Sequence, residues 1–136
     1  MSKKKKLKCI IAGSRTVNDL NTVNKAVEAS GFKDDIVEVV SGTAYGVDKT
    51  GELWAKQHNL PVKQFSADWS NIDVPGAIVR ENAKGKYNAK AGFDRNQKMA
   101  EYADVLVAVM EDNSSGTEDM IQRMSKLEKP FYVWEV

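Results

Sequence analysis

The chain has 136 residues, of which 42% are hydrophobic and 29% are charged. This composition is typical of an ordinary folded protein that buries roughly two-thirds of its unfolded surface, and it excludes a disordered chain. The formal net charge of +1 excludes a strong overall attraction to nucleic acid. No apolar stretch approaches the roughly 20 residues that span a bilayer, so we expect no membrane partner.

The cysteine content and the N-terminus indicate the compartment. Cys9 is the single cysteine and cannot form an internal disulfide, which fits a reducing compartment and predicts a cytoplasmic protein. Residues 1–6 contain four consecutive lysines and are followed by too short an apolar run for a signal peptide. We interpret them as a solvated basic tail, with a nucleic-acid arm as the less favoured alternative.

Strands and helices alternate in the first half of the chain. The nearly continuous apolar run Leu7–Ala12 predicts a strand buried on both faces. A helix is predicted from about Asp19 to Ser30, with Asn18 as its N-cap and Gly31 as its end.

A second such unit follows. The segment 36–41 predicts another strand, and helical spacing begins at Val47. Asn59 and Pro61 end this second helix, before a short third strand over 62–65.

The pattern fails over residues 67–92, which contain Pro75, three glycines and several basic residues. A structureless loop of this length in a compact domain is unusual and often functional. Two interpretations stay open: a flap over a ligand, with Trp69 or Tyr87 stacking on a base, or a solvated insertion. A short helix around 79–83 is a further possibility.

Regular patterns resume after this loop. Asp94 is predicted to cap a helix that ends near Ala103, and residues 105–110 form a fully apolar strand. Another helix carries Met120 on its apolar face, and residues 131–136 form a terminal strand. The alternation predicts an α/β, Rossmann-like three-layer domain with a mainly parallel sheet of about five strands.

Three turns rich in small residues each follow a strand and precede a helix: residues 13–15, 41–46 and 114–117. Ligands of such sheets gather at the carboxyl ends of the strands, where free backbone N–H groups and helix dipoles favour anions. Convergence of three turns is stronger evidence than any single glycine motif. The sequence therefore predicts a phosphate or nucleotide site at this edge.

The same residues carry a family resemblance. The chain resembles a small stand-alone member of the SLOG superfamily, the Rossmann-like group that unites LOG-type phosphoribohydrolases with Smf/DprA-type DNA-processing proteins. The resemblance covers nearly the whole chain, so residues 1–136 are predicted to form a single domain. The matching segments, in order, are Gly13-Ser14-Arg15, Ser41 to Asp48, Phe65 to Trp69, Ala91 to Asn96 with Met99, and Ser115-Gly116-Thr117.

The resemblance implies that these turns and an Arg-Asn pair surround a nucleotide-derived ligand. Arg95 offers a planar fork for phosphate, Asn96 can read a ribose or base edge, and Asp48 can accept from sugar hydroxyls. Simple surface exposure of the arginines and complementation of a helix dipole by Asp48 are the competing interpretations. The predicted ligand-binding residues are Gly13, Ser14, Arg15, Ser41, Gly42, Thr43, Ala44, Gly46, Asp48, Trp69, Arg95, Asn96, Ser115, Gly116 and Thr117.

The last turn departs from the LOG-type enzymes. Their longer glycine-rich motif ends in a glutamate three residues after the threonine, where this chain has Met120, and residues 113–115 replace its Pro and paired Gly. N-glycosidic cleavage needs a carboxylate near an oxocarbenium-like transition state. Glu118 and Asp119 are the candidate catalytic residues, and the sequence predicts neither a metal site nor a cofactor.

Three functions are compatible with these residues. The favoured one is a protein that binds a nucleotide-derived small molecule, as a sensor or sequestering protein. The alternative is an N-glycosidase acting on nucleoside monophosphates or NAD-type compounds. Single-stranded DNA binding through the basic loop ranks lowest, so nucleic acid is an unexpected partner. The Met and Trp positions fit either the core or a self-association face, and we expect a homo-oligomer, a dimer or larger.

Overall fold

The computed structural model describes residues 6–111 and 114–136. Most of the predicted tail, and the part of the last turn formed by Asp112 and Asn113, lie outside the described residues. No helix in the described part of the chain is long and apolar enough to cross a membrane.

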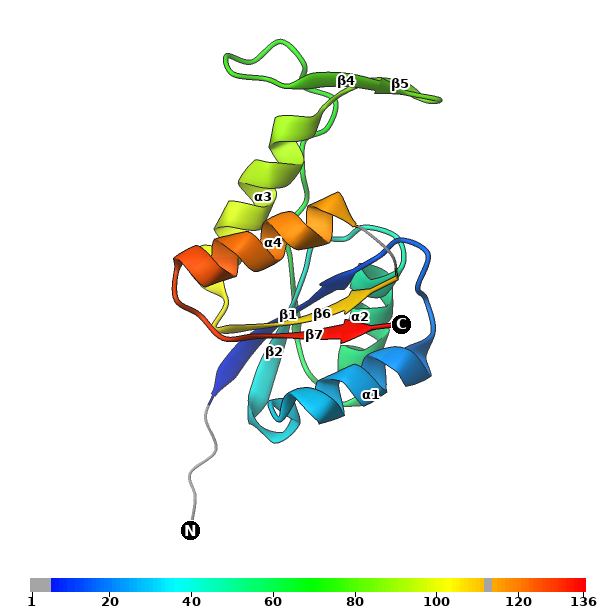
Figure 1. Ribbon diagram of the computed structural model, residues 1–136, viewed down its shortest axis with the longest axis vertical. Helices are drawn as coiled ribbons and strands as arrows, with labels where there is room; N and C mark the ends of the chain where they lie inside the picture. Colours follow the sequence, from blue (N-terminus) through cyan, green and yellow to red (C-terminus); the bar gives the residue numbers. More distant parts are fainter. Residues whose placement is uncertain (1–5, 112–113) are drawn as a thin grey trace.

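Five parallel strands form the central sheet, in the spatial order β3-β2-β1-β6-β7. The fold is an α/β, Rossmann-like three-layer domain, as predicted (Figure 1). Because every crossover returns the chain to the amino end of the sheet, all the strands end at the same edge. The strands are β1 (Leu7–Gly13), β2 (Ile36–Ser41), β3 (Val62–Gln64), β6 (Val105–Met110) and β7 (Phe131–Glu135).

Two helices cover each face of this sheet. Residues of β1 alternate between the two cores: Cys9 and Ile11 pack on one side, Ile10 and Ala12 on the other. Strand β6 is buried throughout, which explains its unbroken apolar sequence. One side is covered by α1 (Leu20–Ser30) and α2 (Val47–Gln57), the other by α3 (Ala89–Tyr102) and α4 (Ser115–Lys126).

Helix α1 ends where the sequence predicts but begins with a different cap. Its end at Gly31, with φ of 81°, is the left-handed cap that only glycine adopts easily. Its N-cap is Asp19, whose carboxylate accepts from the backbone N–H of Asn21 at 3.0 Å, so the expected cap at Asn18 is wrong. The carboxylate is a strong acceptor one position nearer the first turn. A short 3₁₀ turn, η1 (Lys33–Asp35), leads into β2.

The stretch over 67–92 is not a structureless loop. Strands β4 (Val79–Asn82) and β5 (Gly85–Asn88) form an antiparallel hairpin, so the short helix considered over 79–83 is absent. The hairpin stands at the start of α3, away from the main sheet (Figure 1). Gly85 adopts a φ of 115° in the tight reversal between the strands.

Helix α3 begins six residues before the predicted position, since Asn88 and not Asp94 is its N-cap. The buried Asn88 side chain accepts from the backbone N–H groups of Lys90 and Ile78 and donates to the carbonyl of Asn71. One amide thus fixes both the helix start and the base of the hairpin. Asp94 lies within the helix and forms an ion pair with Lys90 at 2.9 Å.

Candidate functional site

The three predicted turns meet at the carboxyl edge of the sheet. Residues from all of them line one cleft with a volume of about 980 Å³, and the hairpin lines the same cleft. Its volume lies near the upper end of the range of about 300 to 1,000 Å³ that is usual for small-molecule sites.

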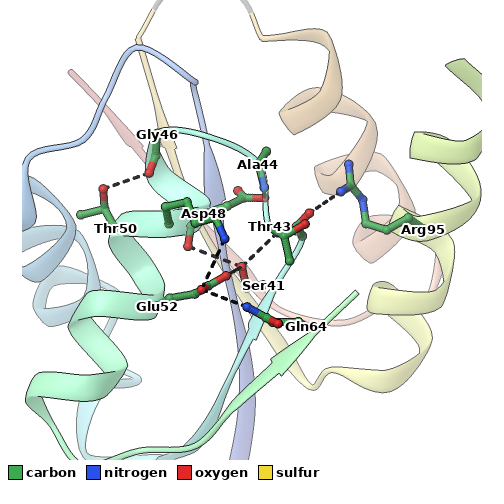
Figure 2. Close-up of polar contacts among 11 residues, drawn as sticks. Ser41, Thr43, Ala44, Gly46, Asp48, Thr50, Glu52, Gln64 and Arg95 are labelled. Atoms are coloured by element: carbon green, nitrogen blue, oxygen red, sulfur yellow. Dashed lines mark hydrogen bonds and ion pairs between the residues drawn. The ribbon is translucent and has the colours of Figure 1, made fainter. Parts of the chain in front are cut away.

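Thirteen of the fifteen predicted ligand-binding residues line this cleft. The two that do not, Ser41 and Gly46, support its wall. They come from the turn between β2 and α2, which Figure 2 shows in detail. The thirteen are Gly13, Ser14, Arg15, Gly42, Thr43, Ala44, Asp48, Trp69, Arg95, Asn96, Ser115, Gly116 and Thr117.

Ser41 holds the β2–α2 turn from behind. Its Oγ accepts from the backbone N–H of Thr43 at 3.1 Å and donates to the carboxylate of Glu52 at 2.6 Å (Figure 2). Thr43 itself has a φ of 64°, a left-handed conformation that is uncommon for a β-branched residue. Strain of this kind persists where the surroundings fix the backbone, and it is concentrated at functional sites.

Gly46 allows two turns to touch. A Cβ at this position would overlap the backbone of Ser14 and Arg15, and its φ of 83° favours glycine independently. The backbone N–H of Val47 then donates to the carbonyl of Ser14 at 3.3 Å. The first turn is also tied to β6, because Ser14 Oγ accepts from the N–H of Glu111 at 2.9 Å.

Arg95 reaches across the cleft floor from α3. Its Nη1 donates to the carbonyl of Gly42 at 2.6 Å and its Nε to Asn96 Oδ1 at 3.1 Å, while its guanidinium lies 5.7 Å from the Trp69 ring centroid. These contacts fix the planar fork in one orientation. Trp69 can lie this close to α3 because Gly92 has no side chain, since a Cβ there would overlap the indole.

Asp48 is the buried charged group of the site. Burial raises the pKa of its carboxyl from 3.8 to about 6, against the lowering effects of the Ala44 N–H and the Arg95 charge. Ala44 N donates to this carboxylate at 3.3 Å. Burial also lowers the pKa of Arg95, and while Asp48 opposes that shift, the nearby Arg15 reinforces it.

Positive charge dominates the cleft. The acidic side chains among its described lining residues are Asp48 and Glu111. Five basic side chains oppose them: Arg15, Arg80, Lys84, Lys86 and Arg95. In addition, no described side chain caps the N-terminus of α4, whose first residues line the cleft. Converging guanidinium groups and a helix N-terminus are suited to an anionic ligand.

The candidate catalytic residues lie outside the cleft. Glu118 is exposed on α4. Asp119 is held by two neighbours, Asn96 Nδ2 at 2.9 Å and Arg123 Nε at 2.8 Å. This network orients Asn96, which also donates to the Gly116 carbonyl at 3.2 Å and so joins α3 to the last turn.

Sequence reasoning missed several lining residues. Tyr45, 74% exposed, lies in the turn over 41–46 and lines the cleft, but it was not among the predicted ligand-binding residues. Asn82 and the basic residues of the hairpin also line the cleft, and the signal that could have placed them was the alternation of side chains around Gly85. No cluster of His, Cys, Asp or Glu suited to a metal occurs among residues 6–111 and 114–136.

The fold and the cleft define a Rossmann-like α/β protein with a ligand-sized cavity at the carboxyl edge of its sheet. Residues 7–71 match the sequence model of a family described as YAcAr, the YspA, cpYpsA-related SLOG family. This match, which covers just under half of the chain, supports membership of the SLOG superfamily. The matched residues begin with β1, include the first two turns and end just after Trp69. At a coarse level, the match points to binding or processing of nucleotide-related ligands. No curated protein and no solved structure matches the chain.

Proposed function

We propose that this protein binds a nucleotide or nucleotide-derived small molecule in the cleft, as a sensor or sequestering protein. The observation that carries the proposal is the convergence of Arg15 and Arg95 beside turns from separate strands. Two like charges held close together repel each other, and an anion between them relieves that repulsion. The phosphate would lie at these turns, with Asn96 and Asp48 available to sugar and base groups.

Aromatic side chains around the cleft are placed to contact the base of such a ligand. Trp69 stands at the cleft with one face toward Arg95 and an edge contact to Tyr87, 6.1 Å between ring centroids. Tyr45 offers a second, exposed ring. Aromatic faces of this kind stack on bases with little sequence preference.

A thermal-shift panel of nucleoside mono-, di- and triphosphates, NAD⁺ and ADP-ribose tests the proposal. At least one compound should raise the melting temperature of the wild type. Arg95→Ala should abolish the rise and Arg95→Lys should reduce it, because lysine keeps the charge but loses the fork. Lys25→Ala, which removes an exposed charge from α1, is the matched control and should leave the rise unchanged. Absence of a rise with every compound would contradict the proposal.

One observation favours N-glycosidase activity as a second candidate. Asp48 places a carboxyl group with a pKa of about 6 in the cleft, a value suited to proton transfer near neutral pH. Asp48, in place of Glu118 or Asp119, would then stabilise the developing sugar cation. Chromatographic detection of free base after incubation with nucleoside monophosphates or NAD⁺ tests this, with Asp48→Asn as the inactive comparison. Intact substrate after prolonged incubation would remove the candidate.

A further inference from the structure

The β4–β5 hairpin presents two chemically different faces. Strand register places Arg80 opposite Tyr87 and Asn82 opposite Gly85, so these residues share one face. The alternate face carries Glu81 opposite Lys86. Tyr87 contacts Trp69, which identifies the Arg80 face as the one turned toward the cleft.

The cationic groups on the cleft side have no acidic partner. Arg80, Lys84 and, from the alternate face, Lys86 line the cleft, yet none of the three forms an ion pair with any described residue. The hairpin's own acid, Glu81, lies on the opposite face and does not line the cavity. The hairpin therefore adds positive charge to the cleft wall that no described carboxylate neutralises. This charge is available to an anionic ligand.

This charge is separate from the arginines of the turns. Arg95 belongs to the cleft floor, where Gly42 and Asn96 fix it, and Arg15 follows β1. Arg80 in β4 and Lys84 in the turn after it belong to a different unit, the β4–β5 hairpin anchored through Asn88. A single phosphate at the turns would not contact the hairpin cations. One cavity of about 980 Å³ nevertheless reaches both the turn arginines and the hairpin cations.

We infer that the hairpin is a second anion-binding wall, and that the ligand is a nucleotide with more than one phosphate. One phosphate lies at the turns beside Arg15 and Arg95, and a further phosphate extends to Arg80 and Lys84. The hairpin thereby sets specificity for phosphate number. The inference rests on the proposed function, because it adds a second group to the same ligand.

The inference is tested by measuring nucleotide affinities by isothermal titration calorimetry with AMP, ADP, ATP, GMP, GDP and GTP. Divalent cations are left out of the buffer so that the phosphates keep their full charge. For the base that binds, the triphosphate should bind wild type about 10-fold more tightly than the monophosphate, through added charge-assisted hydrogen bonds. Arg80→Ala combined with Lys84→Ala should reduce that preference to within about twofold while leaving monophosphate affinity unchanged. The salt dependence of triphosphate binding should fall at the same time.

Two control variants separate the wall from general effects. Glu81→Gln changes the neighbouring residue on the outer face, and Lys25→Ala removes one positive charge far from the cleft; both should keep the wild-type phosphate preference. Equal loss of mono- and triphosphate affinity in the double variant, or an unchanged preference, would overturn the inference and leave the proposed function standing. Failure of all six nucleotides to bind would overturn the inference, and the thermal-shift panel, which also contains NAD⁺ and ADP-ribose, then decides the proposed function.

Discussion

Polar side chains are buried at the carboxyl edge of the central sheet, whereas those at its amino edge stay near solvent. At the carboxyl edge, Ser14, Asp48 and Asn96 are buried. At the amino edge, polar contacts stay near solvent, such as the Lys8 N–H to Asp104 bond of 2.9 Å and the Tyr102 to Glu38 bond. Burying polar groups costs stability unless every group is paired. Every buried side-chain polar atom of the described residues has a hydrogen-bond partner, so the cost that remains at the carboxyl edge is that of burying the Asp48 charge.

The largest expected loss of stability at the carboxyl edge is at Gly13, where β1 ends. A Cβ there would overlap the carbonyl of Val109 and lie 2.8 Å from Val47 Cγ2. Gly13→Ala should therefore reduce the free energy of unfolding by about 3 kcal/mol or more, measured by urea titration. Gly116→Ala is the control, since a Cβ there meets nothing within 4 Å. It should be neutral or stabilise α4 by about 0.5 kcal/mol. Equal losses in both variants would remove close packing as the cause.

Asp48→Asn tests the cost of the buried charge. The pKa of Asp48 is raised from 3.8 to about 6 in the folded protein, so below about pH 4 the carboxyl is neutral in both states and costs nothing. As the pH rises through about 4 to 6 the unfolded chain ionises first, and folding loses on the order of 3 kcal/mol from this group by neutral pH. The stability of Asp48→Asn relative to wild type should increase by that order between about pH 4 and pH 7. A difference that does not vary with pH would contradict the assignment.

Asn96→Ala should weaken both folding and binding. It removes the donor to Gly116 and Asp119 and the acceptor for Arg95 Nε, at a cost of about 2 kcal/mol in urea unfolding. Nucleotide affinity should fall as well, because Arg95 loses one of its fixed contacts. Gln97→Ala, on the next position of α3, also loses hydrogen bonds, to Glu101 and Arg123. It should leave binding intact, and a matching loss of affinity would show that the effect is not specific to Asn96.

The smallest expected effect belongs to the amino edge. Lys129 Nζ donates to the carbonyls of Ala100, Glu101 and Ala103 at the end of α3, at 2.7 to 2.9 Å. Lys129→Met keeps the aliphatic stem but loses these bonds, and should cost about 1 kcal/mol. Nucleotide affinity should not change. A loss of affinity comparable to that of Asn96→Ala would contradict the claim that only the carboxyl edge takes part in binding.

Structural features that depend only on neighbouring residues in the sequence were predictable. The apolar run of β6 gave its bounds, Val105–Met110, because a strand buried on both faces has no polar positions. Gly31 marked the end of α1 for an equally local reason, its positive φ. The meeting of three turns at one edge followed from topology, since parallel strands end together.

Features that depend on tertiary contacts were not predictable. Gly92 interrupts the helical pattern of α3, and only the position of the Trp69 ring explains why it is there. Asn88 begins that helix through contacts to residues ten and seventeen positions away. The raised pKa of Asp48 arises from burial, which no spacing rule reveals. The hairpin was missed for the same reason, because pairing across Gly85 determines which side chains face the cleft.

The central claim, that the carboxyl edge receives an anionic nucleotide, is tested most directly by amide chemical shifts in ¹⁵N-labelled protein. The titrant should be the nucleotide that raises the melting temperature most. We expect the perturbed amides to gather in residues 13–15, 42–44 and 115–117, with those around Lys8 and Asp104 unmoved. Saturable shifts confined to the amino edge, or no saturable shifts at all, would contradict this claim.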